Sequence, residues 1–202
     1  MTLLLEGIMD AFAAMSYWEL LAVGFGIAYI LLAAKESLWT WFFAFFGTLI
    51  YTILFWHDAL LSSAILNFYY MGMAFYGFYL WRGGTKKEEL PISSWSVYLH
   101  GKIILAGLVL SLTGGYISDR YLGANFAYLD TFVMVFSVIA TWMLAKKILE
   151  NWLYWIVVDS VAIVLYWKSG YLATIVLFVL YVILAVYAYV SWRSSVAQHR
   201  SL

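Results

Sequence analysis

The stretch Glu-Asn-Trp-Leu-Tyr-Trp-Ile-Val-Val-Asp, residues 150–159, opens an apolar run that continues to Trp167. If this run is a helix that crosses a bilayer, Asp159 falls near its middle, at a cost of about 2.5–3.5 kcal/mol on insertion scales. Such a carboxylate is expected to face the protein interior or a wet cavity rather than lipid. Asn151, Trp152 and Trp155 precede Asp159 at helical spacing, so a helix brings all four side chains toward one broad face. We interpret this face as one wall of a ligand site.

The composition predicts an integral membrane protein built only from helices. Hydrophobic residues make up 66% of the 202 residues and charged residues 11%, compared with about 25% charged residues in ordinary soluble domains. Aromatic residues reach 21%, more than interfacial belts need, so part of them is expected to line a path or site. The absence of cysteine excludes disulfides, thiolate metal sites and thiol catalysis. A net charge of zero suggests no nucleic-acid partner.

Seven apolar stretches are each long enough to span about 30 Å of hydrocarbon as a helix. They are residues 17–34, 37–56, 59–81, 97–117, 126–145, 150–167 and 170–192. Residues 1–16 contain Glu6 and Asp10 and no basic residue, so they do not resemble a signal peptide and are expected to form a helix on the membrane surface. The polar segment 82–96, which contains the only proline, predicts the longest connector.

The distribution of basic residues predicts the orientation in the membrane. With seven spans, nine basic residues fall on one side and two on the other. The first side holds Lys35, Arg82, Lys86, Lys87, Lys102, Lys146, Lys147, Arg193 and Arg200, and the second holds Arg120 and Lys168. By the positive-inside rule the first side is cytoplasmic. The N-terminus is then outside and the C-terminus inside.

An internal repeat is visible when residue 17 is aligned with residue 128. At this shift Trp81-Arg82 matches Trp192-Arg193, and the other matches include Tyr17 with Tyr128, Lys35 with Lys146 and Tyr70 with Tyr181. After Lys35 the shift between the two repeats changes from 111 to about 114 residues, which aligns Glu36 and Trp41 with Glu150 and Trp155. The later matches return to the shift of 111. The repeat predicts a 3+1+3 arrangement of parallel units, with a symmetry axis along the membrane normal. The predicted parts are an N-terminal segment (1–16), a first three-helix repeat (17–82), a linker with the fourth helix (83–125), a second repeat (126–193) and a cytoplasmic tail (194–202).

Transporters of this design bind substrate near the midplane between corresponding helices. The second helix offers Trp41, Thr48 and Tyr51, and the third offers Asn67 and Tyr70. With Asn151, Trp152, Trp155 and Asp159, these residues form the candidate substrate site. The alternative for the aromatic residues is packing or a membrane belt, and for Asn67 a hydrogen bond between helices.

The candidate side chains suit a flat, hydroxylated and cationic metabolite. Indole and phenol faces stack on flat rings and attract cations, and amides hydrogen-bond hydroxyls and carboxamides. The three histidines, His57, His100 and His199, lie far apart, so neither a metal site nor a cofactor is predicted.

Other function classes fit the sequence less well. No nucleophile–histidine pairing, metalloprotease motif, phosphate loop or dinucleotide fingerprint occurs, so an enzyme is not predicted. A retinal-type photoreceptor needs a lysine buried in a helix, and the last helix, 170–192, has none. A ligand-sensing membrane receptor stays open as an alternative, although its cytoplasmic loops would be short.

Several motifs resemble the PnuC family of bacterial vitamin transporters. They are the 150–159 run, Asn67-Phe-Tyr-Tyr followed by Tyr76-Gly-Phe-Tyr-Leu-Trp-Arg, and the 3+1+3 repeat, covering Tyr17 to Arg193. The resemblance implies a fold like that of the SWEET sugar transporters, a homotrimer in the cytoplasmic (inner) membrane, and facilitated diffusion. It further implies nicotinamide riboside as the substrate, retained after phosphorylation by a cytoplasmic kinase. Thiamine and riboflavin are substrates of other members and stay open as alternatives.

Overall fold

The computed structural model describes residues 2–57, 61–84 and 90–199, and these residues form eight helices. The helices are α1 (Thr2–Ala13), α2 (Tyr17–Ala34), α3 (Trp39–His57), α4 (Leu61–Trp81), α5 (Val97–Leu122), α6 (Ala127–Ala145), α7 (Asn151–Ser169) and α8 (Leu172–His199). The prediction of an all-helical chain is confirmed, and each expected apolar stretch corresponds to one of the helices α2–α8. The helix α8 extends to His199, so much of the segment predicted as a tail continues this helix.

Local sequence signals explain where several helices begin and end. Ser16 and Glu19 form a reciprocal capping box at the start of α2, which satisfies two backbone N–H groups that would otherwise lack partners. Ser96 caps α5 through its side chain, which accepts from the Leu99 amide. Gly123 and Gly170 follow the ends of α5 and α7 at φ of 62° and 81°, a left-handed conformation that glycine adopts without steric cost.

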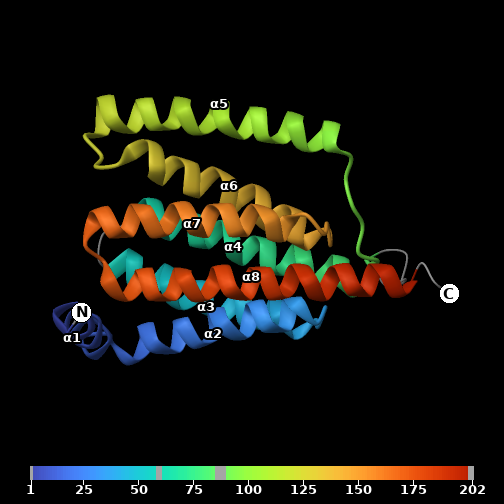
Figure 1. The fold of residues 1–202 in the computed structure, drawn as a ribbon, viewed down its shortest axis with the longest axis horizontal. Coiled ribbons are helices and arrows are strands. Elements are labelled where there is room, and N and C mark those ends of the chain that lie inside the picture. Colours follow the sequence, from blue (N-terminus) through green and yellow to red (C-terminus); the bar gives the residue numbers. More distant parts are fainter. Residues whose placement is uncertain (1, 58–60, 85–89, 200–202) are drawn as a thin grey trace.

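Six of the helices form a closed ring. Around this ring α2 packs on α3, α3 on α4, α4 on α6, α6 on α7, α7 on α8, and α8 on α2. The ring consists of a first triplet, α2–α4, and a second triplet, α6–α8, which meet at two junctions, α4 with α6 and α8 with α2. The repeat relates these two junctions to each other. The helix α5 packs mainly against α6 and touches α7 through His100 and Tyr154, and Figure 1 shows it lying outside the ring. The helix α1 contacts α8 near the N-terminal end of the molecule.

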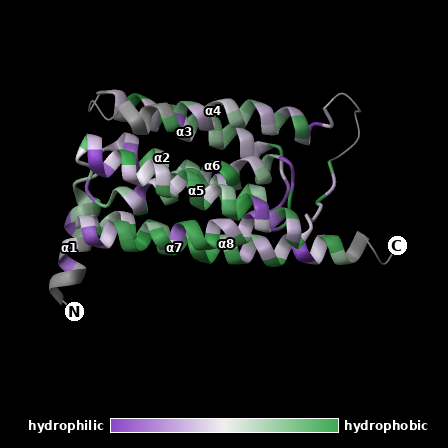
Figure 2. Cartoon of the chain, turned by 90° about the horizontal axis from the view of Figure 1, so that it is seen from above, coloured by the Kyte–Doolittle hydropathy of each residue, from purple (hydrophilic) through white to green (hydrophobic). Residues whose placement is uncertain are grey.

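The outer surface is apolar, as expected for a protein surrounded by lipid. Large apolar side chains are exposed along the helices, for example Ile53, Phe75, Leu105 and Ile183, in larger number than soluble monomers tolerate. Figure 2 shows hydrophobic residues along the middle of the helices and many of the hydrophilic residues at their ends. By length and composition alone, four described helical segments could cross a membrane: Tyr17–Ala34, Val97–Leu122, Ala127–Ala145 and Leu172–Ala197.

The two triplets repeat the same backbone hydrogen bonds at a constant shift of 111 residues. This shift also holds in the turns after α2 and α6, where the sequence alignment changed register. After α2, the Ser37 amide donates to the Leu32 carbonyl at 3.0 Å, and after α6 the Ile148 amide donates to the Met143 carbonyl at 3.0 Å. The amides of Thr40 and Asn151 then donate to the carbonyls of Ser37 and Ile148, both at 3.1 Å. The change of shift inferred from the sequence for this region is therefore wrong. The counterpart of Trp41 is Trp152 and not Trp155, because both turns have the same length.

Corresponding residues of the two triplets meet at one end of the ring. Glu36 and Lys147, which are 111 residues apart, both have positive φ (55° and 51°) and form a salt bridge of 2.8 Å. Two residues related by a two-fold axis touch each other only close to that axis. The salt bridge therefore marks where an approximate two-fold axis passes between the triplets.

Four tryptophans pack beside this salt bridge in a symmetric cluster. Trp41 meets Trp81 edge to face at 5.2 Å and 84°, and the corresponding Trp152 meets Trp192 at 5.4 Å and 85°. Trp81 and Trp192 contact each other across the axis, with ring centroids 6.1 Å apart. The indole N–H of Trp81 donates to the Ala145 carbonyl, and that of Trp192 to the Ala33 carbonyl. All four indoles are 5% exposed or less, so this tryptophan cluster fills the space between the triplets at this end.

The connector between α4 and α5 is attached to the turn between α6 and α7. The amide of Ser93 donates to the Lys147 carbonyl and its carbonyl accepts from the Leu149 amide. Glu150 accepts hydrogen bonds from the Ser94 hydroxyl and the Trp95 amide. The central part of the predicted connector, residues 85–89 with Lys86 and Lys87, lies outside the described residues, as does Arg200.

Candidate functional site

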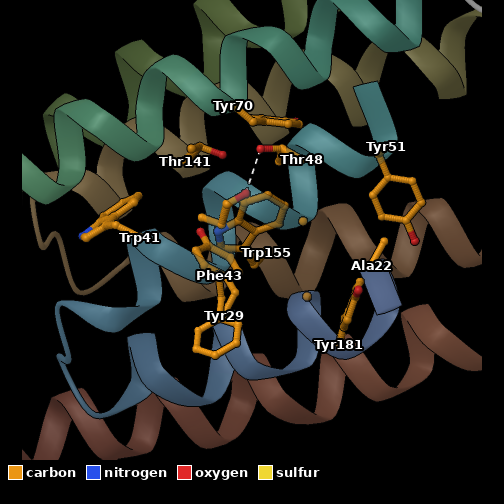
Figure 3. Close-up of a pocket in the computed structure, with 13 residues that line it drawn as sticks. Ala22, Tyr29, Trp41, Phe43, Thr48, Tyr51, Tyr70, Thr141, Trp155 and Tyr181 are labelled. Atoms are coloured by element: carbon orange, nitrogen blue, oxygen red, sulfur yellow. Dashed lines mark hydrogen bonds between the residues drawn. The ribbon is translucent and has the colours of Figure 1, made fainter. Parts of the chain in front are cut away.

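The larger of two cavities inside the ring has a volume of about 230 Å³ and draws its walls from all six ring helices. Its lining comprises Ala22, Gly26, Tyr29, Trp41, Phe43, Ala44, Gly47, Thr48, Tyr51, Tyr70, Thr141, Trp155 and Tyr181. Figure 3 shows these side chains converging from both triplets, with Trp41 at one end of the group and Tyr51 toward the other. The wall is mostly aromatic, and its polar groups are phenol and threonine hydroxyls.

A second cavity of about 130 Å³ adjoins the first between α2, α7 and α8. It is lined by Gly26, Tyr29, Ile30, Trp152, Trp155, Asp159, Tyr181 and Ala185. Gly26, Tyr29, Trp155 and Tyr181 belong to both linings, so these four residues mark the junction. Taken together, the cavities fall near the lower end of the range of about 300–1,000 Å³ that small-molecule sites occupy.

Packing and hydrogen bonding hold the lining residues in place. A side chain at Gly77 on α4 would overlap the Trp41 indole, so the glycine lets this indole lie close against α4. The hydroxyls of Thr48 and Thr141 donate to carbonyls of their own helices, Ala44 and Ser137. This bonding satisfies hydroxyls in an apolar environment.

Asp159 is the one acidic residue among the residues that line the two cavities, and it is 4% exposed. No lysine or arginine occurs in either lining. A carboxylate in such surroundings is costly unless something compensates its charge. The two cavities together therefore offer aromatic faces and one acidic group, a combination that attracts flat cations.

Most residues predicted for the site lie on the cavity walls. Trp41, Thr48, Tyr51 and Tyr70 line the larger cavity, Trp152 and Asp159 line the smaller one, and Trp155 lines both. The predicted face of α7 thus points into the ring, with Trp155 toward the cavity shared with α3 and α4, and Trp152 and Asp159 toward α2 and α8. A binding role for these residues remains a prediction.

The two predicted asparagines lie elsewhere. Asn151 is fully buried at the start of α7, where its side-chain amide donates to the Ile148 carbonyl at 2.7 Å. This bond ties the first turn of α7 to the end of the preceding turn. Asn67 is half-buried on α4 and belongs to neither lining.

The sequence reasoning missed Tyr29, Thr141, Tyr181 and Gly26. A signal for Tyr181 was present, because the repeat pairs it with Tyr70, which was predicted. Thr141 corresponds to Ile30 in the same register, and both line a cavity. Tyr29 and Gly26 carry no comparable signal, since an apolar helix such as α2 reveals its inward face only once its neighbours are known.

Comparison with known proteins gives the family. Residues 16–194 match the family model described as "Nicotinamide mononucleotide transporter". The chain belongs to this family. The match covers the helices α2 to α7 and most of α8.

Individual relatives include transporters of different vitamins. The nicotinamide riboside transporter PnuC of Escherichia coli strain K12 is 22% identical, over 93% of this chain and 89% of its own length. The riboflavin/roseoflavin transporter RibM of Streptomyces davaonensis is 26% identical, over 83% of this chain and 80% of its own. A crystal structure of the vitamin B3 transporter PnuC superimposes with a TM-score of 0.73 at 24% identity, covering 97% of this chain and 91% of that one. The fold is therefore that of PnuC, and the chain is a membrane transporter by family.

Proposed function

We propose that this chain carries nicotinamide riboside across the bacterial cytoplasmic membrane by facilitated diffusion. The observation that carries the proposal is Asp159, a buried acid beside Trp152 and Trp155 in a ring with no basic lining residue. Nicotinamide riboside joins a flat cationic pyridinium to a ribose. Each indole that stacks on such a cation attracts it by about 0.5–2 kcal/mol. The Asp159 carboxylate adds attraction between opposite charges. Relatives named as nicotinamide riboside transporters support the same substrate.

In this proposal α2–α8 cross the membrane as a 3+1+3 arrangement and α1 lies at the outer surface. Residues 17–82 and 126–193 are the two parallel repeats, and residues 83–125 link them through α5. The constant shift between corresponding backbone hydrogen bonds supports this division. The basic residues at the tryptophan-cluster end, Lys35, Lys146, Lys147 and Arg193, put that end in the cytoplasm by the positive-inside rule. The N-terminus is then outside and the C-terminus inside.

The proposed roles follow the linings of the cavities. Trp152 and Trp155 stack the pyridinium, and Asp159 compensates its charge from the same helix. Trp41, Thr48, Tyr51 and Tyr70 complete the wall on the first repeat. Asn151 and Asn67 were expected to hydrogen-bond the ligand. Because neither lines a cavity, a direct contact from either requires a change of conformation, and Asn151 supports the site by fixing the start of α7.

Retention of the substrate depends on charge. Phosphorylation by a cytoplasmic kinase adds negative charge to the riboside. A path that contains one buried carboxylate and no basic lining residue repels that product. We further expect a homotrimer, with the exposed apolar faces of the helices available for contacts between subunits.

The relative named as a riboflavin/roseoflavin transporter makes riboflavin a second candidate. Thiamine, which like nicotinamide riboside is an aromatic cation, is a third. The deciding experiment is uptake of labelled nicotinamide riboside into liposomes that contain only this protein, with the three unlabelled vitamins as competitors. We expect saturable uptake that excess nicotinamide riboside abolishes. Stronger competition by riboflavin or thiamine would reassign the substrate, and tight binding without uptake would favour a receptor.

Asp159→Asn tests the charge argument. We expect weaker binding of the cationic riboside by about tenfold, a loss of about 1.4 kcal/mol, with competition by neutral riboflavin unchanged. Unchanged affinity for the riboside would remove Asp159 from the site and leave it a role in helix packing.

A further inference from the structure

Tyr70 and Tyr181 occupy corresponding positions in the two repeats and both line the larger cavity. They lie on α4 and α8 and are related by the same shift as Glu36 and Lys147, the shift that the backbone hydrogen bonds follow. Their neighbours across the helix junctions also correspond, because this shift relates Gly26 on α2 to Ser137 on α6. The two tyrosines therefore allow a direct comparison of the two halves of the site.

The comparison reveals an asymmetry in what each phenol touches. Tyr70 interacts with the Ser137 side chain across the α4–α6 junction, so the protein offers this phenol a polar neighbour. At the other junction a Cβ atom on Gly26 would lie 2.6 Å from the Tyr181 hydroxyl oxygen. The Tyr181 hydroxyl thus occupies the space that a serine side chain would need.

Within the part of the chain that the structure describes, residues 2–57, 61–84 and 90–199, the Tyr181 hydroxyl has no hydrogen-bond partner. Gly26 has no side chain that could donate or accept a hydrogen bond. A hydroxyl held in an apolar site gains from a ligand that satisfies it. Tyr181 also lies at the junction, in both linings, beside Tyr29 and Trp155.

We propose that the Tyr181 hydroxyl hydrogen-bonds a sugar hydroxyl of the transported molecule, with Gly26 providing the space for this contact. The inference rests on the proposed function and extends it by a specificity-determining residue. The aromatic ring of the substrate stacks near Trp152, Trp155 and Asp159, and its sugar reaches past Tyr181 into the larger cavity. Tyr70, beside Ser137, contributes its ring face to the wall and no hydrogen bond to the sugar.

The test compares two cationic ligands by calorimetric titration of the purified protein. Nicotinamide riboside carries the sugar, and 1-methylnicotinamide presents the same pyridinium with a methyl group in its place. Tyr181→Phe is expected to weaken riboside binding about tenfold, the effect of one lost hydrogen bond, and to leave 1-methylnicotinamide binding within about twofold. Tyr187→Phe on the same helix is the matched control, because Tyr187 is exposed and belongs to neither lining, and its riboside affinity is expected within about twofold of wild type.

Each contrary result is informative. Equal riboside affinity in Tyr181→Phe and wild type overturns the inference, as does an equal loss for both ligands or an equal loss in Tyr187→Phe. Gly26→Ala provides a second route should Tyr181→Phe not fold, because the added methyl must displace the hydroxyl and selectively weaken the riboside. If wild type binds neither ligand, the proposed substrate is wrong, a result distinct from failure of the Tyr181 contact.

Discussion

The Glu36–Lys147 salt bridge gives the sharpest test of the two-fold relation between the triplets. Glu36→Lys places two ammonium groups in contact at the axis. Complete removal of one partner from a buried pair costs about 3–5 kcal/mol. The Lys147 side chain is 9% exposed and that of Glu36 is 28% exposed. Because solvent reaches Glu36, we expect a smaller loss of about 2–4 kcal/mol, lowering the unfolding midpoint by roughly 5–15 °C.

The exchange of both residues is the informative variant. The two positions have nearly equal φ angles and follow corresponding helices, so Glu36→Lys combined with Lys147→Glu should rebuild the pair in mirrored order. We expect the double variant to recover at least half of the loss. Thermal unfolding in detergent, followed by the monodisperse fraction on size exclusion, measures the midpoints. A double variant no more stable than the worse single variant would refute the equivalence of the two positions.

Two further predictions concern packing. Gly77→Ala should destabilise the protein by about 1–3 kcal/mol, because the methyl group overlaps the buried Trp41 indole, whereas Gly72→Ala on the same helix meets open space and should stabilise it by about 0.5–1 kcal/mol. Equal midpoints for the two variants would show that the indole moves freely. Trp192→Phe should cost about 1–3 kcal/mol through a lost hydrogen bond and a small cavity, and Trp167→Phe, at 63% exposure, less than about 0.5 kcal/mol. A loss in Trp167→Phe as large as that in Trp192→Phe would contradict the burial argument. Thermal unfolding measures all four variants.

The positions of the helices were predictable from sequence because lipid makes one demand on every span. A run of about 20 apolar residues must satisfy its backbone internally, and a helix does so within one segment. The stretches predicted at 17–34 and 126–145 therefore match α2 and α6 within one residue at each end. The end of α8 was less predictable, because a polar helix that leaves the membrane carries no apolar signal.

The inward face of α7 was predictable from its charge. Asp159 is too costly to leave in lipid, and helical spacing then placed Trp152 and Trp155 on the same side. On α2 no polar residue marks a face, so the contributions of Tyr29 and Gly26 to the cavities depended on how α7 and α8 pack against it.

The register of the repeat shows a different limit. Chemical similarity aligned Glu36 with Glu150 and Trp41 with Trp155, whereas the turns align Glu36 with Lys147 and Trp41 with Trp152. Residues on a two-fold axis must complement each other, so a pair of opposite charges replaces two like charges there. Identity of residue type is therefore a poor guide at positions where the two halves touch.

The most direct test of the account asks whether the space inside the ring is the route of the substrate. The chain contains no cysteine, so Thr48→Cys and Thr141→Cys, on opposite triplets, give labelling without background by a water-soluble thiol reagent. A thiol at the exposed apolar position Leu105 on α5 serves as the control, since a thiol in lipid does not ionise and reacts poorly. The account predicts that both cavity thiols react and that nicotinamide riboside slows both, with no effect at the control position. Cavity thiols that stay unreactive, or that react at the same rate with and without the riboside, would contradict it.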